Sequence, residues 1–133
     1  MIKRNINIYW LLSLLYMGFI FYLSSYPEPI KVPSFSCSDK LLHIVEYGIL
    51  ASLIYLALNK GNVTKHYFVA LAFTISFLYG VSDEIHQHFV PGREADIFDV
   101  IANGIGALCF PLALQVRIYF QNSRSEIIRT KAR

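Results

Sequence analysis

A stretch of ionisable side chains separates two apolar runs that carry no charge, residues 67–81 and 100–116. Carboxylates, imidazoles and one guanidinium follow one another there at short spacing: Asp83, Glu84, His86, His88, Arg93, Glu94, Asp96 and Asp99. Such groups can transfer protons, hold a divalent cation or bind an anion. Polar groups beside apolar segments of membrane length are costly in a bilayer, so this stretch is predicted to form a functional site.

A second polar group opens the apolar segment 41–58. Its members occur at i, i+4, i+7 and i+8, which is one face of a helix: Asp39, His43, Glu46 and Tyr47. His43 is predicted to act as a general acid or base, oriented by Asp39 one turn earlier. The structural alternative is a hydrogen bond from His43 to a neighbouring helix, for example to Asp99. Glu46 lies deeper in the segment and is expected to have a structural partner.

Two further segments bring polar groups to the same end of the predicted bundle. The last segment places polar and small residues on one face at spacings of three, four and three: Asp96, Asp99, Asn103 and Gly106. The preceding segment contributes Asp83, Glu84 and Gln87 from its outer end. Small residues four apart, such as Ala102 and Gly106, allow two helices to approach closely, and Asn103 is expected to form interhelical hydrogen bonds. The three faces together predict a small polar pocket.

Arg93 follows Pro91 and Gly92, a pair typical of a tight turn. Its guanidinium can hold a phosphate or a carboxylate through two parallel hydrogen bonds. The alternative is an ion pair that fixes the loop, with one of three carboxylates as partner: Asp96, Asp99 or Glu84.

The reaction chemistry stays open at this level. Asp83 and Glu84 can serve as metal ligands, as bases or as partners of Arg93. His86 and His88 are two residues apart, so on a helix they point in different directions, and they are expected at the membrane interface. The sequence contains no phosphate loop, no HExxH motif and no evident serine or cysteine nucleophile. An enzyme of this sequence would therefore use acid–base or metal-assisted chemistry, and a divalent cation is compatible with the sequence but not required by it.

The elements that position these groups are apolar. Hydrophobic residues make up 55% of the 133 residues and charged residues only 16%, a composition typical of membrane proteins. Four segments approach the roughly 20 residues that cross a hydrocarbon core as a helix: residues 8–24, 41–58, 67–85 and 100–120. The sequence predicts an all-α polytopic membrane protein. Its fold would be a single-domain four-transmembrane-helix bundle over residues 1–133, with the first segment retained and not cleaved as a signal peptide.

Charge is distributed unevenly between the two ends of the predicted bundle. Nine of the 12 basic residues lie in the N-terminal segment, the second loop and the C-terminal segment, and eight of the nine acidic residues lie at the opposite end. The positive-inside rule then places both termini in the cytoplasm and the polar site on the outer side of the membrane. The basic tail, residues 121–133, is predicted to lie on anionic lipid or to be disordered. Membrane lipids are the expected partners, nucleic acid is not expected, and an oligomer is compatible with the sequence.

Two motifs carry a resemblance to a known family. They read Asp39-Lys40-x-x-His43-x-x-x-Tyr47 and Asp83-Glu84-x-x-Gln87-x-Phe89-x-Pro91-Gly92-Arg93-x-x-x-x-x-Asp99-x-x-x-Asn103-x-x-Gly106. With the order of the spans, the chain resembles the VanZ-like family over residues 8–120. That family consists of small bacterial integral membrane proteins, and its name-giving member lowers susceptibility to the glycopeptide teicoplanin. The resemblance implies a role in the bacterial cell envelope and a location in the cytoplasmic membrane.

The resemblance and the residues together lead to a functional hypothesis. The chain is expected to recognise or modify an anionic envelope lipid or a lipid-linked cell-wall intermediate, with an altered response to teicoplanin as one outcome. The catalytic candidates are His43, Asp39, Asp83, Glu84 and Asp99. The ligand-binding candidates are Arg93, Gln87, Tyr47, Asn103 and Asp96. Whether the protein is an enzyme stays open, and the alternatives are a non-catalytic lipid-binding protein or a structural protein whose polar cluster is an interhelical network.

Overall fold

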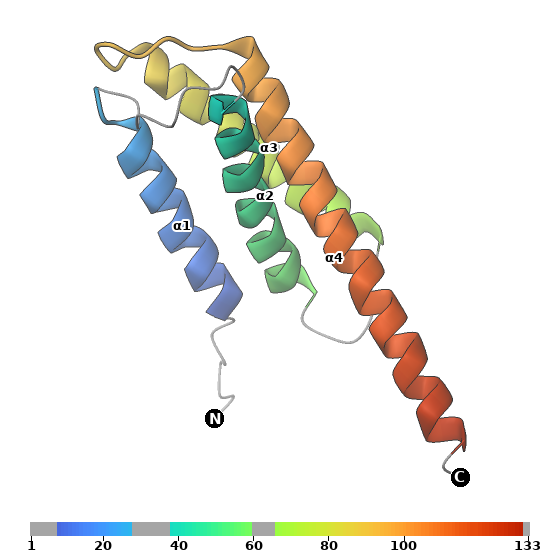
Figure 1. Ribbon diagram of the computed structural model, residues 1–133. Coiled ribbons are helices and arrows are strands. Elements are labelled where there is room, and N and C mark those ends of the chain that lie inside the picture. The colour runs from blue at the N-terminus through green and yellow to red at the C-terminus, as the bar shows by residue number, and fades with distance from the viewer. Residues whose placement is uncertain (1–7, 28–37, 60–65, 132–133) are drawn as a thin grey trace, which may run out of the picture.

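The computed structural model describes residues 8–27, 38–59 and 66–131, and the regular secondary structure within these ranges is all helical (Figure 1). Four helices follow one another along the chain: α1 (Ile8–Ser24), α2 (Ser38–Leu58), α3 (His66–His88) and α4 (Ile97–Lys131). The predicted all-α class is confirmed, and the bounds of α1 agree with the prediction. The other helices are longer than the apolar segments because their polar ends are helical too.

The greatest difference from the prediction is the length of α4, which has 35 residues. At 1.5 Å per residue it is about 52 Å long, well beyond the roughly 30 Å of a hydrocarbon core. Residues 121–131 continue this helix. The alternative that the basic tail is disordered is therefore wrong for these residues, whereas its contact with anionic lipid stays a prediction.

Three helices, α2, α3 and α4, are long and apolar enough to cross a membrane. Helix α1 is also apolar, but its 17 residues make it shorter, at about 26 Å. Large apolar side chains such as Leu14, Leu78 and Ile101 point away from the helix contacts and are exposed. Polar side chains such as His43, Asp83 and Asn103 are instead buried between helices. This distribution suits a protein whose outer surface contacts lipid.

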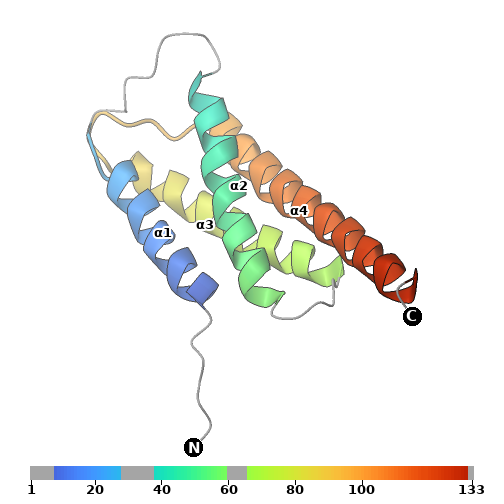
Figure 2. The ribbon, with the colours of Figure 1, turned by 60° about the horizontal axis from the view of Figure 1, so that its bottom comes forward.

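Helix α2 is the centre of the bundle. It packs against each of the other three helices and most extensively against α4, whereas α1 packs mainly against α2 (Figures 1 and 2). The apolar core extends from the cavity side of the bundle, at Ile20 and Tyr47, toward its other end, and consists of Ile20, Tyr47, Leu50, Ile54, Tyr55, Val69 and Ala72.

Gly106 determines how closely α2 and α4 approach. A Cβ atom added at Gly106 would lie 2.0 Å from the carbonyl oxygen of Ile44, so only glycine fits there. The predicted close contact at this small residue is confirmed. It brings the first turns of α2 and α4, which carry the polar motifs, into direct reach of each other.

The helices alternate in direction, so one end of the bundle collects four helix termini (Figure 1). These are the C-terminal ends of α1 and α3 and the N-terminal ends of α2 and α4. The polar segments of the sequence therefore meet at this end, whereas the first residue of α1 and the last of α4 lie at the other.

Candidate functional site

The connection between α3 and α4 begins with a β-turn at Val90–Arg93. The Arg93 N–H donates to the Val90 carbonyl oxygen at 3.1 Å, and Gly92 has a φ of 81°. In a type II turn, proline is common at the second position and a glycine with a positive φ occupies the third. Pro91 and Gly92 hold these two positions here. A Cβ at Gly92 would also lie 2.8 Å from the Pro27 carbonyl oxygen. The turn is thus held against the end of α1, and it fixes the backbone of Arg93.

The Arg93 side chain is positioned by a neutral residue. Its Nη2 donates to Gln87 Oε1 at 2.7 Å, and Gln87 Nε2 donates to Asp83 Oδ2 at 3.0 Å. Among the described residues, no carboxylate lies within 4.0 Å of the guanidinium. The alternative in which Arg93 pairs with Asp96, Asp99 or Glu84 is therefore not what the structure shows.

Lys40, and not Arg93, forms ion pairs with Asp96 and Asp99. Its Nζ donates to Asp96 Oδ2 at 2.5 Å and to Asp99 Oδ1, and it lies 3.8 Å from Asp39 Oδ2. Lys40 thereby ties the first turn of α2 to the start of α4. Sequence reasoning assigned Lys40 no role, although one signal was present. A cation in the first turn of a helix is unfavourable against the helix dipole, which points to an acidic partner nearby.

Asp96 caps α4. Its Oδ1 accepts the Phe98 N–H at 2.9 Å, as expected of an N-cap residue, while its Oδ2 accepts from Lys40. The hydrogen bond from Lys40 is the main cause that holds the pKa of the Asp96 carboxyl below its usual value of 3.8. Glu84 Oε2 accepts the Asp96 N–H at 3.2 Å. Asp96 and Glu84 are therefore engaged in fixing the start of α4.

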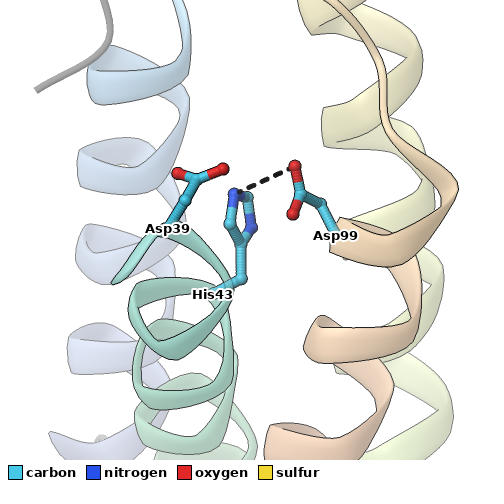
Figure 3. A group of neighbouring side chains, drawn as sticks. All are labelled: Asp39, His43 and Asp99. Carbon is cyan, nitrogen blue, oxygen red and sulfur yellow. Dashed lines mark ion pairs between the residues drawn. The ribbon is translucent and has the colours of Figure 1, made fainter. Parts of the chain in front are cut away.

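His43 is buried between α2 and α4, with 7% of its surface exposed. Its Nδ1 lies 2.9 Å from Asn103 Oδ1, and its Nε2 lies 3.8 Å from Asp99 Oδ2. Figure 3 shows the ring between Asp39 and Asp99. The expected hydrogen bond to a neighbouring helix exists, but its partner is Asn103. With Asn103 Oδ1 as acceptor, Nδ1 carries the proton and Nε2 presents its lone pair to the site.

Two adjoining cavities open around these side chains. One, of about 70 Å³, lies between α1, α2 and α3, and the other, of about 140 Å³, lies at the turn before α4. Four residues line both of them: Asp39, His43, Gln87 and Arg93. The predicted polar pocket is thus present at the end of the bundle where the polar segments meet.

The ten predicted site residues divide into two groups. Six line a cavity: Asp39, His43, Asp83, Gln87, Arg93 and Asp99. Four line neither cavity and lie behind or beside them: Tyr47, Glu84, Asp96 and Asn103. Tyr47 and Asn103 are completely buried. We therefore assign these four to the support of the cavity wall.

The structure adds lining residues that sequence reasoning missed. Helix α1 supplies Ile20, Leu23 and Ser24, which give the smaller cavity an apolar side. Their apolar and small types carry no signal of a site. Glu46 lines the same cavity, and among the described residues it has neither an ion pair nor a hydrogen bond. The structural partner expected for Glu46 is not found in this part of the chain.

Several buried polar atoms near the cavities have no hydrogen-bond partner among the described residues. They are Glu84 Oε1 and Asn103 Nδ2, together with Tyr47 Oη and Asp83 Oδ1, whose side chains lie close to each other without meeting the strict geometry of a hydrogen bond. A buried polar atom without a partner costs about 1–3 kcal/mol. Three of these residues, Tyr47, Glu84 and Asn103, line neither cavity, so buried water and not a ligand would satisfy their atoms.

His86 and His88 lie outside this cluster. His86 Nε2 is 3.0 Å from Ser25 Oγ, and its ring stacks on Phe21 with centroids 4.6 Å apart. His88 is exposed and packs edge-on against Phe89. The two imidazoles point to different surroundings, as their spacing predicts.

The comparisons with known proteins bear on the same residues. The family model described as VanZ/LLP1 matches residues 8–119, which include both motifs and all six predicted residues that line the cavities. No curated protein and no solved structure matches the chain. Since the match spans most of the chain, this membrane protein belongs to the VanZ-like family.

Proposed function

We propose that the protein binds or modifies an anionic envelope lipid, or a lipid-linked cell-wall intermediate, at the cavities around Arg93. The observation that supports this proposal most directly is the position of the Arg93 guanidinium at the cavities. The Arg93 side chain is held in place by Gln87, it lines both cavities, and no described carboxylate forms an ion pair with it within 4.0 Å. A guanidinium with free donors at a cavity is suited to two parallel hydrogen bonds with a phosphate.

The lining of the smaller cavity supports a ligand with an apolar part. Ile20, Leu23 and Leu42 line it together with polar residues, which are Ser24, Asp39, His43, Glu46, Asp83, Gln87 and Arg93. An amphiphile can place its head group against the polar residues and its chain against the apolar ones. A soluble anion would gain nothing from the apolar side chains of α1.

His43 supports chemistry at the bound head group. With Asn103 holding Nδ1, the Nε2 atom can accept or return a proton beside Asp39 and Asp99 (Figure 3). In the catalytic form of the proposal His43 transfers the proton, and the neighbouring carboxylates stabilise its charged state.

The proposed topology completes this assignment. All four helices cross the bacterial cytoplasmic membrane, both termini lie inside, and the cavities face the outer side. The support is the concentration of basic residues near both termini and in the second loop, which the positive-inside rule places in the cytoplasm. An outward site could meet cell-wall intermediates and thereby change the response to teicoplanin.

Lipid retention by the purified protein tests the proposal. Wild type and Arg93→Ala would be purified in mild detergent, and bound lipids would be identified by native mass spectrometry. Loss of the charged contact should weaken binding by about 2 kcal/mol or more, roughly thirty-fold. Arg117→Ala is the matched control, because Arg117 is exposed on α4 far along the helix from the site.

The outcomes separate three functions. A defined anionic lipid held by wild type and Arg117→Ala, but lost by Arg93→Ala, supports the proposal. If His43→Ala then keeps the lipid but loses turnover, the protein is an enzyme. If it keeps the lipid and wild type shows no turnover, the protein is a lipid-binding protein. Equal lipid on all variants contradicts the proposal.

The structural alternative has its own support in Lys40, which joins Asp96 and Asp99 across two helices. In that case the polar cluster serves only to connect α2 with α4. Unchanged lipid content together with lower thermal stability of Asp99→Ala would favour it.

A further inference from the structure

We infer that Asp39, His43 and Asp99 form a binding site for a divalent transition-metal cation. One nitrogen and two carboxylate oxygens from these residues lie within 4.8 Å of one another. All three residues line the larger cavity, so a cation there would have room for further ligands. Asp83 and Glu84, which the sequence also allowed as ligands, do not belong to this group.

The surroundings of His43 point to a metal. Metal-ligating histidines almost always donate their second ring N–H to an oxygen acceptor, which fixes the ring and its tautomer. His43 Nδ1 has such a partner in Asn103 Oδ1 at 2.9 Å. Its Nε2 forms no hydrogen bond to a described residue, and Asp99 Oδ2 faces it at 3.8 Å. An imidazole lone pair and a carboxylate oxygen that face each other beside a cavity are two acceptors, and a metal ion can bind both, as a proton or a bridging water also can.

The Asp99 carboxylate is also held by a hydrogen bond that leaves one of its atoms for the metal. Ligating carboxylates are themselves hydrogen-bonded, and Lys40 Nζ donates to Asp99 Oδ1. The other oxygen, Oδ2, remains directed at His43. Lys40 therefore orients Asp99 without covering the atom that would bind the cation.

The charge around the three proposed ligands favours a cation. Asp39, Asp96 and Asp99 carry three negative charges within reach of Lys40, which supplies one positive charge. A net negative charge remains, which Glu94 increases and Arg93 reduces at the same cavity, and a divalent cation would offset it. Asp83 Oδ1, which is buried without a described partner, adds to the negative potential in the adjoining cavity.

The ligand set favours zinc or manganese over magnesium. An imidazole together with carboxylates suits transition metals, whereas magnesium prefers oxygen ligands alone. Metal–ligand bonds of about 2.0 Å separate the ligands of a tetrahedral site by roughly 3.3 Å, so the side chains need to close by on the order of 1 Å. The Asp39 side chain is 63% exposed and can make this movement.

Three protein ligands leave at least one coordination position open, which is typical of catalytic metal sites. Water or a phosphate oxygen can occupy it. With Nε2 bound to the cation and Nδ1 held by Asn103, His43 could not also transfer the proton that the catalytic form of the lipid proposal assigns to it. If the proposed lipid function holds, the cation would also offset Asp39, Asp99 and Glu94, which line the cavity beside Arg93 and would otherwise repel an anionic head group. Metal binding itself requires no lipid, so the two proposals can fail separately.

Metal content of the purified protein tests the inference. Wild type in mild detergent would be stripped of metal with a chelator and then loaded with Zn²⁺ or Mn²⁺. Unbound metal would be removed on a desalting column, and the bound metal would be measured by elemental mass spectrometry. About one ion per chain is expected for wild type. His43→Gln and Asp39→Asn should lose it, and Asn103→Ala should bind roughly 10–100-fold more weakly because the ring loses its support.

Glu94→Gln is the matched control, because Glu94 lines the same cavity but is not one of the three proposed ligands. It should retain the metal. Loading with Co²⁺ gives a second readout, since the visible absorption of Co²⁺ changes when imidazole coordinates it. Thermal unfolding of each stripped variant establishes that it is folded.

No metal on folded wild type, or equal metal on wild type and His43→Gln, would overturn the inference. If the protein binds the metal but no specific lipid, the metal site is supported and the lipid proposal is contradicted. If it binds a specific lipid but no metal, the lipid proposal is supported and the metal site is contradicted.

Discussion

Lys40 of α2 forms an ion pair with Asp99 of α4, and the same ammonium group holds Asp96, the residue that caps α4. The side chains come from segments more than fifty positions apart in the sequence. This contact joins the two motifs of the family into one cluster. It also determines which oxygen of Asp99 is left to face His43.

Lys40→Met is expected to destabilise the protein. Asp99 is buried, so its carboxylate would lose a charged hydrogen bond worth about 1–3 kcal/mol. Thermal unfolding in detergent would measure the loss. Lys40→Arg should restore most of the stability because it keeps the charge. If the Met and Arg variants unfold at the same temperature, the ion pair does not stabilise the bundle.

Gly106→Ala is expected to separate α2 from α4. The new Cβ would overlap the Ile44 carbonyl oxygen, and overpacking of this kind costs about 1–3 kcal/mol. Gly18→Ala is the control, since a Cβ at Gly18 has nothing within 4 Å, and it should change stability by less than about 1 kcal/mol. Equal unfolding temperatures for the two variants would contradict the close approach of the helices.

Acidification should weaken the start of α4. Lys40 lowers the pKa of Asp96 in the folded protein below its usual value of 3.8. The ionised Asp96 therefore contributes stability above pH 3.8, and this contribution is lost as the pH falls further, through the folded-state pKa. Unfolding temperatures measured across this range should fall more steeply for wild type than for Asp96→Asn. Parallel curves would exclude a role for this carboxylate.

Cysteine labelling should establish the orientation. Cys37 lies outside the described residues, in the segment that joins α1 to α2 at the polar end. In a Cys109→Ser background, a membrane-impermeant maleimide should label Cys37 in intact cells. A cysteine placed at Lys60, in a Cys37→Ser and Cys109→Ser background, should react only after the membrane is opened. The opposite pattern would invert the topology and place the cavities inside.

Much of the site could be predicted because helical periodicity alone determines which residues share a face. Asp39 and His43 are four apart, as are Asp99 and Asn103, so each pair must project from one side of its helix. The apolar segments likewise predicted four helices, three of which are long enough to span a membrane. The apolar segments stop short of the polar helix ends because hydropathy marks apolar residues and not helical backbone.

Sequence periodicity by itself determined that polar faces would meet at one end of an apolar helical bundle. Only the tertiary structure decided which groups pair across the helices. Arg93 and Lys40 are equally able to pair with Asp99, and the choice depends on distances between separate elements. Gly106 brings Lys40 within reach of Asp99, and the turn at Gly92 directs Arg93 to Gln87. A side chain's partner is determined by such contacts in space, which residue types and spacing along one helix do not contain.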